Sequence, residues 1–433
     1  MECLANDYVV IDKESHPGSQ IFRFTPSIFV TKTGRYIFAN ELRTKGHPGS
    51  AEDTPHFDEI LPNPYGGTNH VGQIFVSDDK GQTWRYVCAR NFSQQKIFEA
   101  GGALYILGHS DDLVIYRSLD NGETWDDGHW LTEGKLWHQS ACGLWIEDGY
   151  VNAVMEERWN KPGEPISKGW NISSLAPVMM RAKEDADLTK RESWTFSDSI
   201  RFRDLIDENT LEWFGVPFYP SDLQAQAFPE GTYLQKQCGW LESNLVRIKD
   251  PKHYWYDPTG KTLHILMRTH TGGTGYCAIM RAVISEENGK ETIRILPQTN
   301  PSGRKVVFLP MPGGHNRFHV LWDEPSQLYW LVSVQSLDSM TRMELLSKDR
   351  YNIPCDERHR LQLHFSKNLV DWCFAGMLAI GPTERHSRHY TSVDVDGDDL
   401  LFVSRTSDEN ADSAHNNNMN TFHRVRNFRS LAY

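Results

Sequence analysis

The stretch SDDKGQTW at residues 77–84 returns as SLDNGETW at residues 118–125. An Asp, a Gly and a Trp keep the same spacing in both copies, and Asp79 and Asp120 lie 41 positions apart. A weaker relative, SKNLVDW at 366–372, has Asn in place of the Asp and is one residue shorter. A period near 40 residues is typical of propeller blades, so the repeat predicts a small sheet that recurs along the chain.

Short apolar runs recur between these motifs and favour strands over helices. PSIFVTKTGRYIFA, GGALYILG and LYWLVSV are examples, and each is bounded by Gly, Asp or Asn. Such runs are too short for typical helices and are rich in β-branched and aromatic residues, which predicts strands joined by tight turns. The fold class is therefore predicted to be nearly all β.

A second repeated element is an entry segment that leads into a hydrophobic strand, a turn and another strand. Six entries predict a six-bladed β-propeller that forms a single domain over residues 1–433, with an elaborated loop region around 158–238. A seventh blade hidden between His138 and Glu242 is the alternative, and the tail TFHRVRNFRSL is expected to supply the outer strand that closes the last blade. The six entries are FTPS (24–27), FEAG (98–101), HQSA (138–141), LESN (241–244), RFHV (317–320) and HYTS (389–392).

Charge and hydropathy exclude some classes of partner. The formal net charge of -12 argues against nucleic acid, which requires a concentrated basic face, although a basic pocket can lie inside an acidic shell. No apolar stretch approaches the roughly 20 residues of a membrane-spanning helix, so no membrane partner is expected. The oligomeric state is left open.

The cysteines and the N-terminus suggest the compartment. Seven cysteines are scattered and odd in number, and they form no CxxC pair, which favours a reducing environment and predicts neither a metal site nor a cofactor. The N-terminal MECLANDYVVIDKE carries acids and no apolar run of leader length. The sequence as written is therefore expected in the cytoplasm, and a secreted or periplasmic protein is expected only if a leader was removed.

The motif SxDxGxTW is the Asp-box, and two good copies in a six-fold β repeat resemble the sialidase superfamily, also described as BNR-repeat proteins. The resemblance implies that Asp79, Gly81 and Trp84, like their second copies, build a turn and a packing contact. It also implies a retaining glycosidase that uses a Tyr nucleophile, a paired Glu, an Asp acid/base and three Arg that hold a carboxylate.

Three entries resemble the segments that carry this chemistry. WLESNLVRI followed by LHILMR implies catalytic Glu242 and substrate-binding Arg268, and SRHYTSVDVDGDDLLFVSR implies the nucleophile Tyr390. GGHNRFHVLWDE falls where the third Arg is expected, which implies Arg317.

The first blade departs from the family pattern. Phe24 stands where sialidases have an Arg before the Pro, and the adjacent Arg23 would point to the opposite face of a strand. Arg388, beside Tyr390, is a substitute cation. For the acid/base, the loop ELRTKGHPGSAEDTPHFDEILPN offers Asp53 and Asp58 without a motif to choose between them.

Histidines gather at or near the entries. His70, His138 and His315 are the candidates for binding substrate beside the arginines, and they suggest a site that handles a proton and an anionic group. Arg405 occupies the position after LLFVS that Arg268 occupies after LHILM, so it is either a second cation or a structural repeat.

Three functions remain open. The leading one is an exo-acting glycoside hydrolase that cleaves a terminal sugar, an acidic one being favoured, from an oligosaccharide or glycoconjugate. The second is a polysaccharide lyase that acts on a glucuronide with a His or Tyr base, and its product would absorb in the ultraviolet. The third is a carbohydrate-binding propeller without catalysis.

Overall fold

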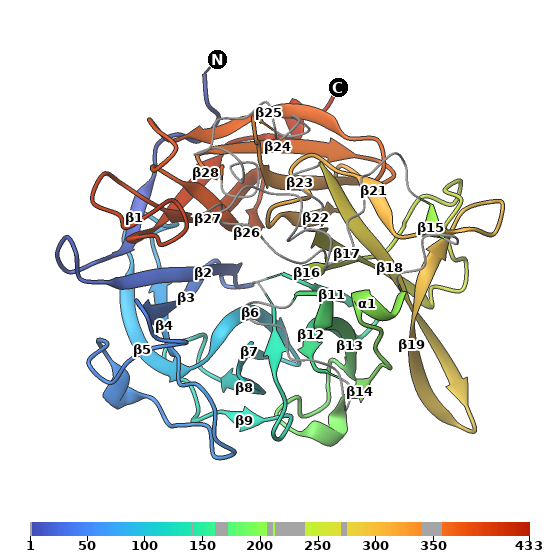
Figure 1. Cartoon of the computed structure of the whole chain (residues 1–433), viewed down its shortest axis with the longest axis horizontal. Helices are drawn as coiled ribbons and strands as arrows, with labels where there is room; N and C mark the ends of the chain where they lie inside the picture. Colours follow the sequence, from blue (N-terminus) through green and yellow to red (C-terminus); the bar gives the residue numbers. More distant parts are fainter. Residues whose placement is uncertain are drawn as a thin grey trace, which may run out of the picture.

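Six sheets, antiparallel except for one short parallel pair of strands, surround a central axis in the computed structural model (Figure 1). The structure describes residues 2–139, 142–160, 172–205, 211–212, 239–269, 275–338 and 357–433. The sheets confirm the predicted six-bladed propeller. The first three blades, from the innermost strand outward, consist of β2 (Ile21–Val30), β3 (Tyr36–Thr44), β4 (Val71–Ser77) and β5 (Arg85–Asn91); β6 (Ser93–Ala100), β7 (Ala103–Ser110), β8 (Asp112–Ser118) and β9 (His129–Trp130); and β10 (Trp137–His138) with β11 (Leu144–Glu147), β12 (Tyr150–Arg158), β13 (Leu175–Lys183) and β14 (Thr195–Phe196).

The other three blades follow the same plan. They consist of β16 (Trp240–Val246), β17 (Thr262–Thr269), β18 (Tyr276–Glu287) and β19 (Lys290–Thr299); β22 (His319–Asp323), β23 (Leu328–Val334), β24 (Arg360–Ser366) and β25 (Cys373–Ile380); and β26 (Arg388–Asp396), β27 (Asp399–Thr406), β28 (Met419–Val425) and β1 (Val9–Lys13). The short strands β15 (Leu211–Glu212), β20 (Lys305–Val306) and β21 (Phe308–Pro310) extend blade four. The short helices are η1 (Phe57–Glu59), η2 (Ile172–Ser174), η3 (Arg191–Ser193), α1 (Phe202–Leu205) and η6 (Phe428–Leu431).

The ring is closed by the N-terminus, which corrects the expectation for the tail. The tail strand β28 is the third strand of blade six, and β1 pairs with it from the outside. Leu4 and Ala5 also donate main-chain hydrogen bonds to Met377 and Leu378 of blade five. The tail cannot form the outer strand because it turns into the 3-10 helix η6 (Phe428–Leu431) directly after β28.

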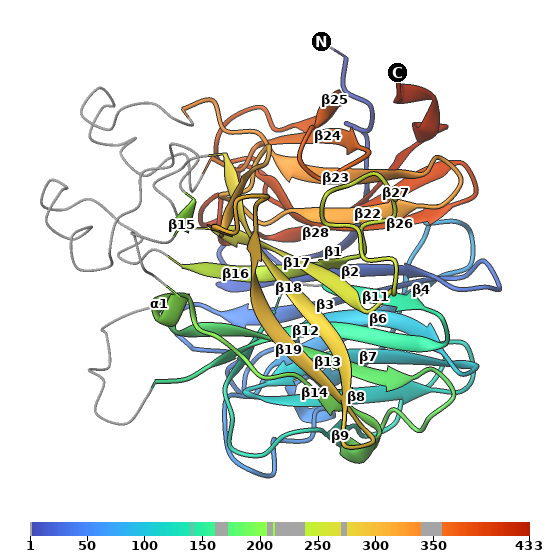
Figure 2. The ribbon, with the colours of Figure 1, turned by 90° about the vertical axis from the view of Figure 1, so that its right-hand side faces the viewer.

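The region between His138 and Glu242 completes blade three. β12, β13 and the two-residue β14 lie in this region and join β10 and β11 in one sheet, and the short helix α1 follows. Most of the predicted elaborated loop lies outside the described residues, which contain six sheets and no seventh. The hairpin of β18 and β19 runs obliquely past the edge of blade three (Figure 2).

Both Asp-boxes are turns between the third and the outer strand of a blade. The Asp79 carboxylate accepts hydrogen bonds from Thr83 N (2.9 Å) and Thr83 Oγ1 (2.6 Å), and Asp120 binds Thr124 in the same way. Gly81 and Gly122 both have a φ of 86°, which favours glycine.

The Asp-box tryptophans pack between neighbouring blades. Trp84 contacts Tyr36, Phe38 and Phe422, whereas Trp125 belongs to a core cluster built from blades one and two. The geometry thus agrees with the structural role expected for the motif, which is to build a turn and a packing contact.

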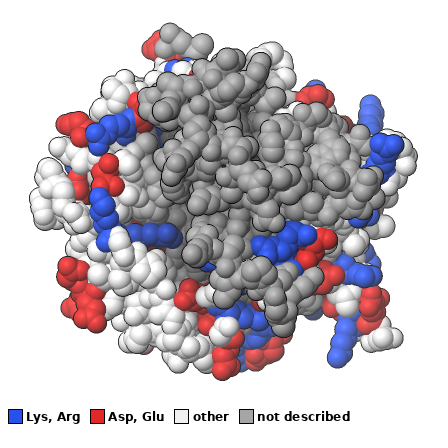
Figure 3. All heavy atoms as spheres, viewed as in Figure 1, with Lys and Arg blue, Asp and Glu red and all other residues white. Residues whose placement is uncertain are grey.

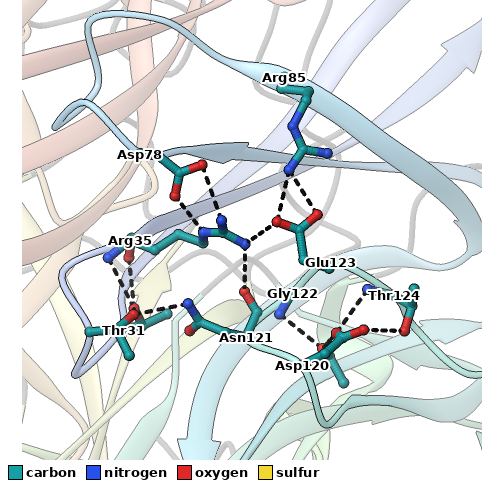
Figure 4. Close-up of polar contacts among 11 residues, drawn as sticks. Thr31, Arg35, Asp78, Arg85, Asp120, Asn121, Gly122, Glu123 and Thr124 are labelled. Atoms are coloured by element: carbon teal, nitrogen blue, oxygen red, sulfur yellow. Dashed lines mark hydrogen bonds and ion pairs between the residues drawn. The ribbon is translucent and has the colours of Figure 1, made fainter.

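Arg35 joins the turns of blades one and two on the surface (Figure 4). Its guanidinium contacts Asp78 at 2.6 Å and Glu123 at 2.6 Å, and Glu123 also binds Arg85 at 2.8 Å. The two Asp-box turns are therefore tied to each other by charge as well as by packing.

Two further observations concern the cysteines and the helices of the described residues. The five described cysteines are all free thiols. Within the described part of the chain, no helix is long and apolar enough to cross a bilayer.

Candidate active site

Four of the inner strands contain the same irregularity near their start. The register shifts after Phe24, Ser93, Leu241 and His389, so that one extra residue bulges out of each strand. The first bulged residue has a positive φ in every case: 32° at Thr25, 51° at Gln94, 59° at Glu242 and 51° at Tyr390. A left-handed conformation costs free energy in a non-glycine residue and is concentrated at functional sites.

The second strand of the same blades supplies a polar partner at a fixed place. The residue before each bulge pairs with Glu41, His109, Arg268 or Arg405. Each of these four blades therefore presents two side chains side by side, one from the bulge and one from the second strand. All eight residues are buried, and all but Glu41 line one cavity.

This cavity has a volume of about 960 Å³ and collects positive charge. Five arginines lie on its wall against the two carboxylates Asp111 and Glu242, although the chain as a whole is acidic. On the face shown in Figure 3, by contrast, acidic and basic side chains are mixed among the described residues at the edge of the molecule. The five arginines are Arg43, Arg158, Arg268, Arg358 and Arg405.

Tyr390, Glu242 and Arg268 form a closed triangle of polar contacts. The Tyr390 hydroxyl donates a hydrogen bond of 2.5 Å to Glu242 Oε1. Arg268 Nη1 lies 3.2 Å from Glu242 Oε2 and 3.0 Å from the Tyr390 oxygen. Its Nε donates to the carbonyl of His315 at 3.0 Å, which fixes the orientation of the guanidinium.

Two more arginines lie over the ring of Tyr390. The Arg405 guanidinium carbon is 4.4 Å from the ring centroid, and that of Arg358 is 5.7 Å away. Arg405 also covers Phe24, the residue that stands where sialidases have an Arg, at 3.7 Å. The phenol therefore sits among three cations, which stabilise negative charge that develops on its oxygen.

The ionisation of the triad follows from burial and charge together. Burial alone would raise the pKa of Glu242, but Arg268, His138 and the hydrogen bond from Tyr390 outweigh it, so the pKa lies below its usual value. Burial lowers the pKa of Arg405 to about 9, although Tyr390 acts in the opposite direction. Glu242 is thus a carboxylate at neutral pH and can accept a proton.

The structure brings half of the ten sequence-predicted site residues to this cavity. Tyr390, Glu242, Arg268, His70 and His138 all line it. His70 cannot act as a cation there, because burial, with Arg43 and His47, lowers its pKa to about 3. His315 is buried outside the wall and contributes only its carbonyl group to Arg268.

The acid/base candidates and two of the arginines do not reach the cavity. Asp53 and Asp58 are exposed in the loop after β3 and are absent from the wall. Arg317 is buried before β22, whose pairing shows no register shift that would turn it inward. Arg388 binds the carbonyls of Ser387 and Ser407.

Arg23 behaves as the strand geometry predicted. Its Nε contacts Asp12 at 3.0 Å on β1. It therefore fixes the closing strand and leaves Phe24 to face the cavity.

The second blade's entry was placed wrongly. FEAG lies at the end of β6, whereas the bulge that faces the cavity lies at Gln94 and Gln95. SQQK at 93–96 lacks the apolar character that marked the other entries.

Several residues of the site were missed. Glu41 and His109 follow from the same rule that relates Arg405 to Arg268, once the bulges are aligned. Arg358 and Asp111 lie in connections between strands, where no repeat marks them. Among the described residues, no three His, Cys, Asp or Glu side chains cluster as metal ligands would.

Comparisons with known proteins support the fold. No family model and no curated protein sequence matches the chain. Among solved structures, the NanB sialidase from Streptococcus pneumoniae is similar with a TM-score of 0.52 and 9% identity, over 97% of this chain and 71% of that one. A protein of unknown function from Dyadobacter fermentans is similar with a TM-score of 0.50 and 12% identity, over 97% and 98%.

This chain has the sialidase-type six-bladed propeller fold. The GH93 α-L-arabinofuranosidase of Fusarium graminearum, solved with arabinobiose, is also similar, with a TM-score of 0.49, 12% identity and 98% coverage of both chains. At such identities the likeness concerns the backbone. Function has to be argued from the residues in the cavity.

Proposed function

We propose that the protein is an exo-acting, retaining glycoside hydrolase with Tyr390 as its nucleophile and a terminal acidic sugar as its substrate. The observation that carries the proposal is the hydrogen bond of 2.5 Å from Tyr390 to Glu242 in a cavity lined by five arginines. The fold shared with glycosidases agrees with it and is not its basis.

The first step forms a glycosyl–tyrosine bond. The Tyr390 oxygen attacks the anomeric carbon, its proton passes to Glu242, and the bond from that carbon to the leaving oxygen breaks as the leaving oxygen takes up a proton. In the second step water displaces Tyr390 and returns it to the phenol with the proton from Glu242. A neutral nucleophile suits an anionic sugar, because a carboxylate nucleophile would repel the charge of the substrate.

The arginines account for the acidic sugar. Arg268 holds the nucleophile and its base, while Arg358 and Arg405 lie over the Tyr390 ring, where the sugar's carboxylate would have to sit. Arginine binds carboxylates with two parallel hydrogen bonds, which favours an acidic over a neutral ring.

Covalent trapping tests the proposal. The protein is incubated with fluorinated glycosyl fluorides of sialic, glucuronic and galacturonic acid, in which the fluorine beside the anomeric carbon slows breakdown of the intermediate. Peptide mass spectrometry is expected to find one adduct, on Tyr390. An adduct on another residue would overturn the nucleophile, and labelling by a neutral arabinofuranosyl probe alone would overturn the acidic substrate.

Experiments with the same acidic sugars also distinguish the two other functions, a lyase and a binding propeller. A product that absorbs in the ultraviolet would indicate elimination at a uronate and replace hydrolysis by a lyase reaction. Tight binding of an acidic glycan with no cleavage, unchanged in Tyr390→Phe, would indicate a binding propeller.

A further inference from the structure

His138 and Glu156 form a second buried pair on the wall of the cavity. They face each other across β10 and β12, and His138 Nδ1 lies 2.9 Å from Glu156 Oε2. The exposed fraction is 6% for His138 and 0% for Glu156. His138 lines the cavity and Glu156 stands behind it.

The carboxylate of Glu156 is fixed from the other side by blade four. Its Oε1 accepts the main-chain N–H of Ser243 at 2.8 Å and also the Ser243 hydroxyl. Ser243 follows Glu242 in the same bulge. Held by these contacts, the Glu156 carboxyl group cannot turn, so it orients the imidazole toward the catalytic pair.

The arrangement assigns different tasks to the two imidazole nitrogens. With Nδ1 donating to Glu156, proton exchange toward the cavity falls to Nε2. His138 lines the same cavity as Tyr390 and Glu242, and it contributes to the lowered pKa of Glu242. A chain of contacts thus runs from Tyr390 through Glu242, Ser243 and Glu156 to His138.

The other ionisable groups at the cavity suit proton transfer less well. Asp111 Oδ2 accepts the N–H of Thr68 at 2.9 Å, which binds it to the loop at the rim. His109 and His70 are buried, and their pKa values fall well below the usual value and to about 3, respectively. Neither histidine is an imidazolium at neutral pH, so neither has an acidic proton to give.

We propose that His138, oriented by the positioning residue Glu156, is the group that protonates the leaving oxygen and then deprotonates water. This inference rests on the proposed function. In the first step the Nε2 proton passes to the glycosidic oxygen as its bond to the anomeric carbon breaks. In the second step neutral His138 takes a proton from the water that displaces Tyr390, which restores the imidazolium.

The test compares two leaving groups on the same acidic sugar. A nitrophenyl glycoside needs no protonation of its leaving oxygen, whereas an alkyl glycoside does. His138→Gln is expected to lower kcat/KM about 10²- to 10⁴-fold for the alkyl glycoside and less than about tenfold for the nitrophenyl glycoside. His70→Gln, a buried histidine on the same wall, is the matched control and is expected to affect both substrates equally.

Glu156→Gln tests the positioning role through the pH profile. The amide keeps a hydrogen bond to Nδ1 but removes the charge that stabilises the imidazolium, so the alkaline limb of kcat/KM for the alkyl glycoside should move to lower pH. Glu242 on β16 and His109 on β7 also interact electrostatically with His138, and both are unchanged in this variant. An unshifted limb would overturn the role of Glu156.

Equal losses on both leaving groups, or no loss, would overturn the role of His138. His138→Asn serves as a second variant if Gln disturbs folding, which thermal unfolding followed by circular dichroism detects. Tyr390→Phe in the same assay separates the two proposals. If it abolishes turnover while His138→Gln behaves as wild type, only the role of His138 falls.

Other outcomes of the same assay also separate the role of Tyr390 from that of His138. If Tyr390→Phe retains activity while His138→Gln depends on the leaving group, the nucleophile is wrong and the acid/base stands. An ultraviolet-absorbing product that is lost in His138→Gln replaces hydrolysis by elimination and keeps His138 as the proton-transfer group. A wild-type protein that cleaves neither glycoside overturns both proposals.

Discussion

Glu242 and Tyr390 occupy the same position of the same bulge in blades four and six, and their side chains meet at 2.5 Å. Their left-handed backbone turns both side chains out of the inner strands and into the cavity. The same bulge therefore places a carboxylic acid in the cavity from blade four and a phenol from blade six.

Replacing Glu242 by Gln should remove the base without removing the hydrogen bond from Tyr390. The amide oxygen still accepts that bond but cannot take the proton, so kcat should fall about 10²- to 10⁴-fold with KM little changed. Steady-state kinetics on the nitrophenyl glycoside measures this. Glu147→Gln is the control, because Glu147 is paired with Arg247 and Lys249 away from the cavity, and it should leave kcat unaltered.

Replacing Arg405 by Met should weaken binding of the acidic sugar. Loss of one charge-assisted contact, about 1.5–3 kcal/mol, corresponds to a rise in KM of roughly 10- to 100-fold. Arg388→Met makes the same change at a buried arginine outside the cavity and is expected to leave KM as it is. A similar rise in both variants would show that Arg405 acts through the fold alone.

Replacing Trp125 by Ala should destabilise the contact between blades one and two. The side chain is only 5% exposed, and truncation of a buried Trp costs about 3–5 kcal/mol. Urea unfolding measures the loss, and Trp125→Phe should recover part of it. A change below about 1 kcal/mol would mean that the Asp-box Trp contributes little packing.

Stability should fall as the pH is lowered below about 6.5, the ordinary pKa of histidine. Burial lowers the pKa of His70, His264 and His423 to about 3, so each binds a proton in the unfolded chain before it does so in the fold. Their contribution is complete above pH 6.5 and is lost toward pH 3, with a slope of about 1.4 kcal/mol per pH unit for each histidine.

Urea unfolding at pH 5, 6 and 7 tests this in wild type and in His264→Gln. The variant should show a shallower dependence on pH, because one of the buried histidines with a lowered pKa has been removed. Leu266→Ala, a truncation on the same strand without a titratable group, should shift the whole curve in parallel. A parallel shift in His264→Gln would contradict the linkage.

The sequence was sufficient for the architecture and for the centre of the site. The spacing of the two Asp-boxes indicated the length of one blade. The segments LESN and HYTS resembled a known pattern closely enough to indicate Glu242, Tyr390 and Arg268. These residues lie at repeated positions of regular strands, so the repeat itself points to them.

The rest of the site depended on features that a sequence does not display. The bulges at Glu242 and Tyr390 contain no glycine or turn motif that would reveal them, and SQQK gave no sign that Gln94 lies near the start of an inner strand. Arg358 lies outside the repeat in a connection between strands. VVIDK reads as a strand, but nothing local says that its partner is β28 at the far end of the chain.

The closing strand β1 makes the completion of blade six depend on two segments that lie far apart in the sequence. Blade six lacks its outer strand until Val9–Lys13 meet β28, about 400 positions later in the sequence, so the ring can close only after β28 has been synthesised. Such a long closure is entropically costly and slow to form. Tyr390 lies on β26, the inner strand of that same blade, so we expect its final position to depend on this late closure.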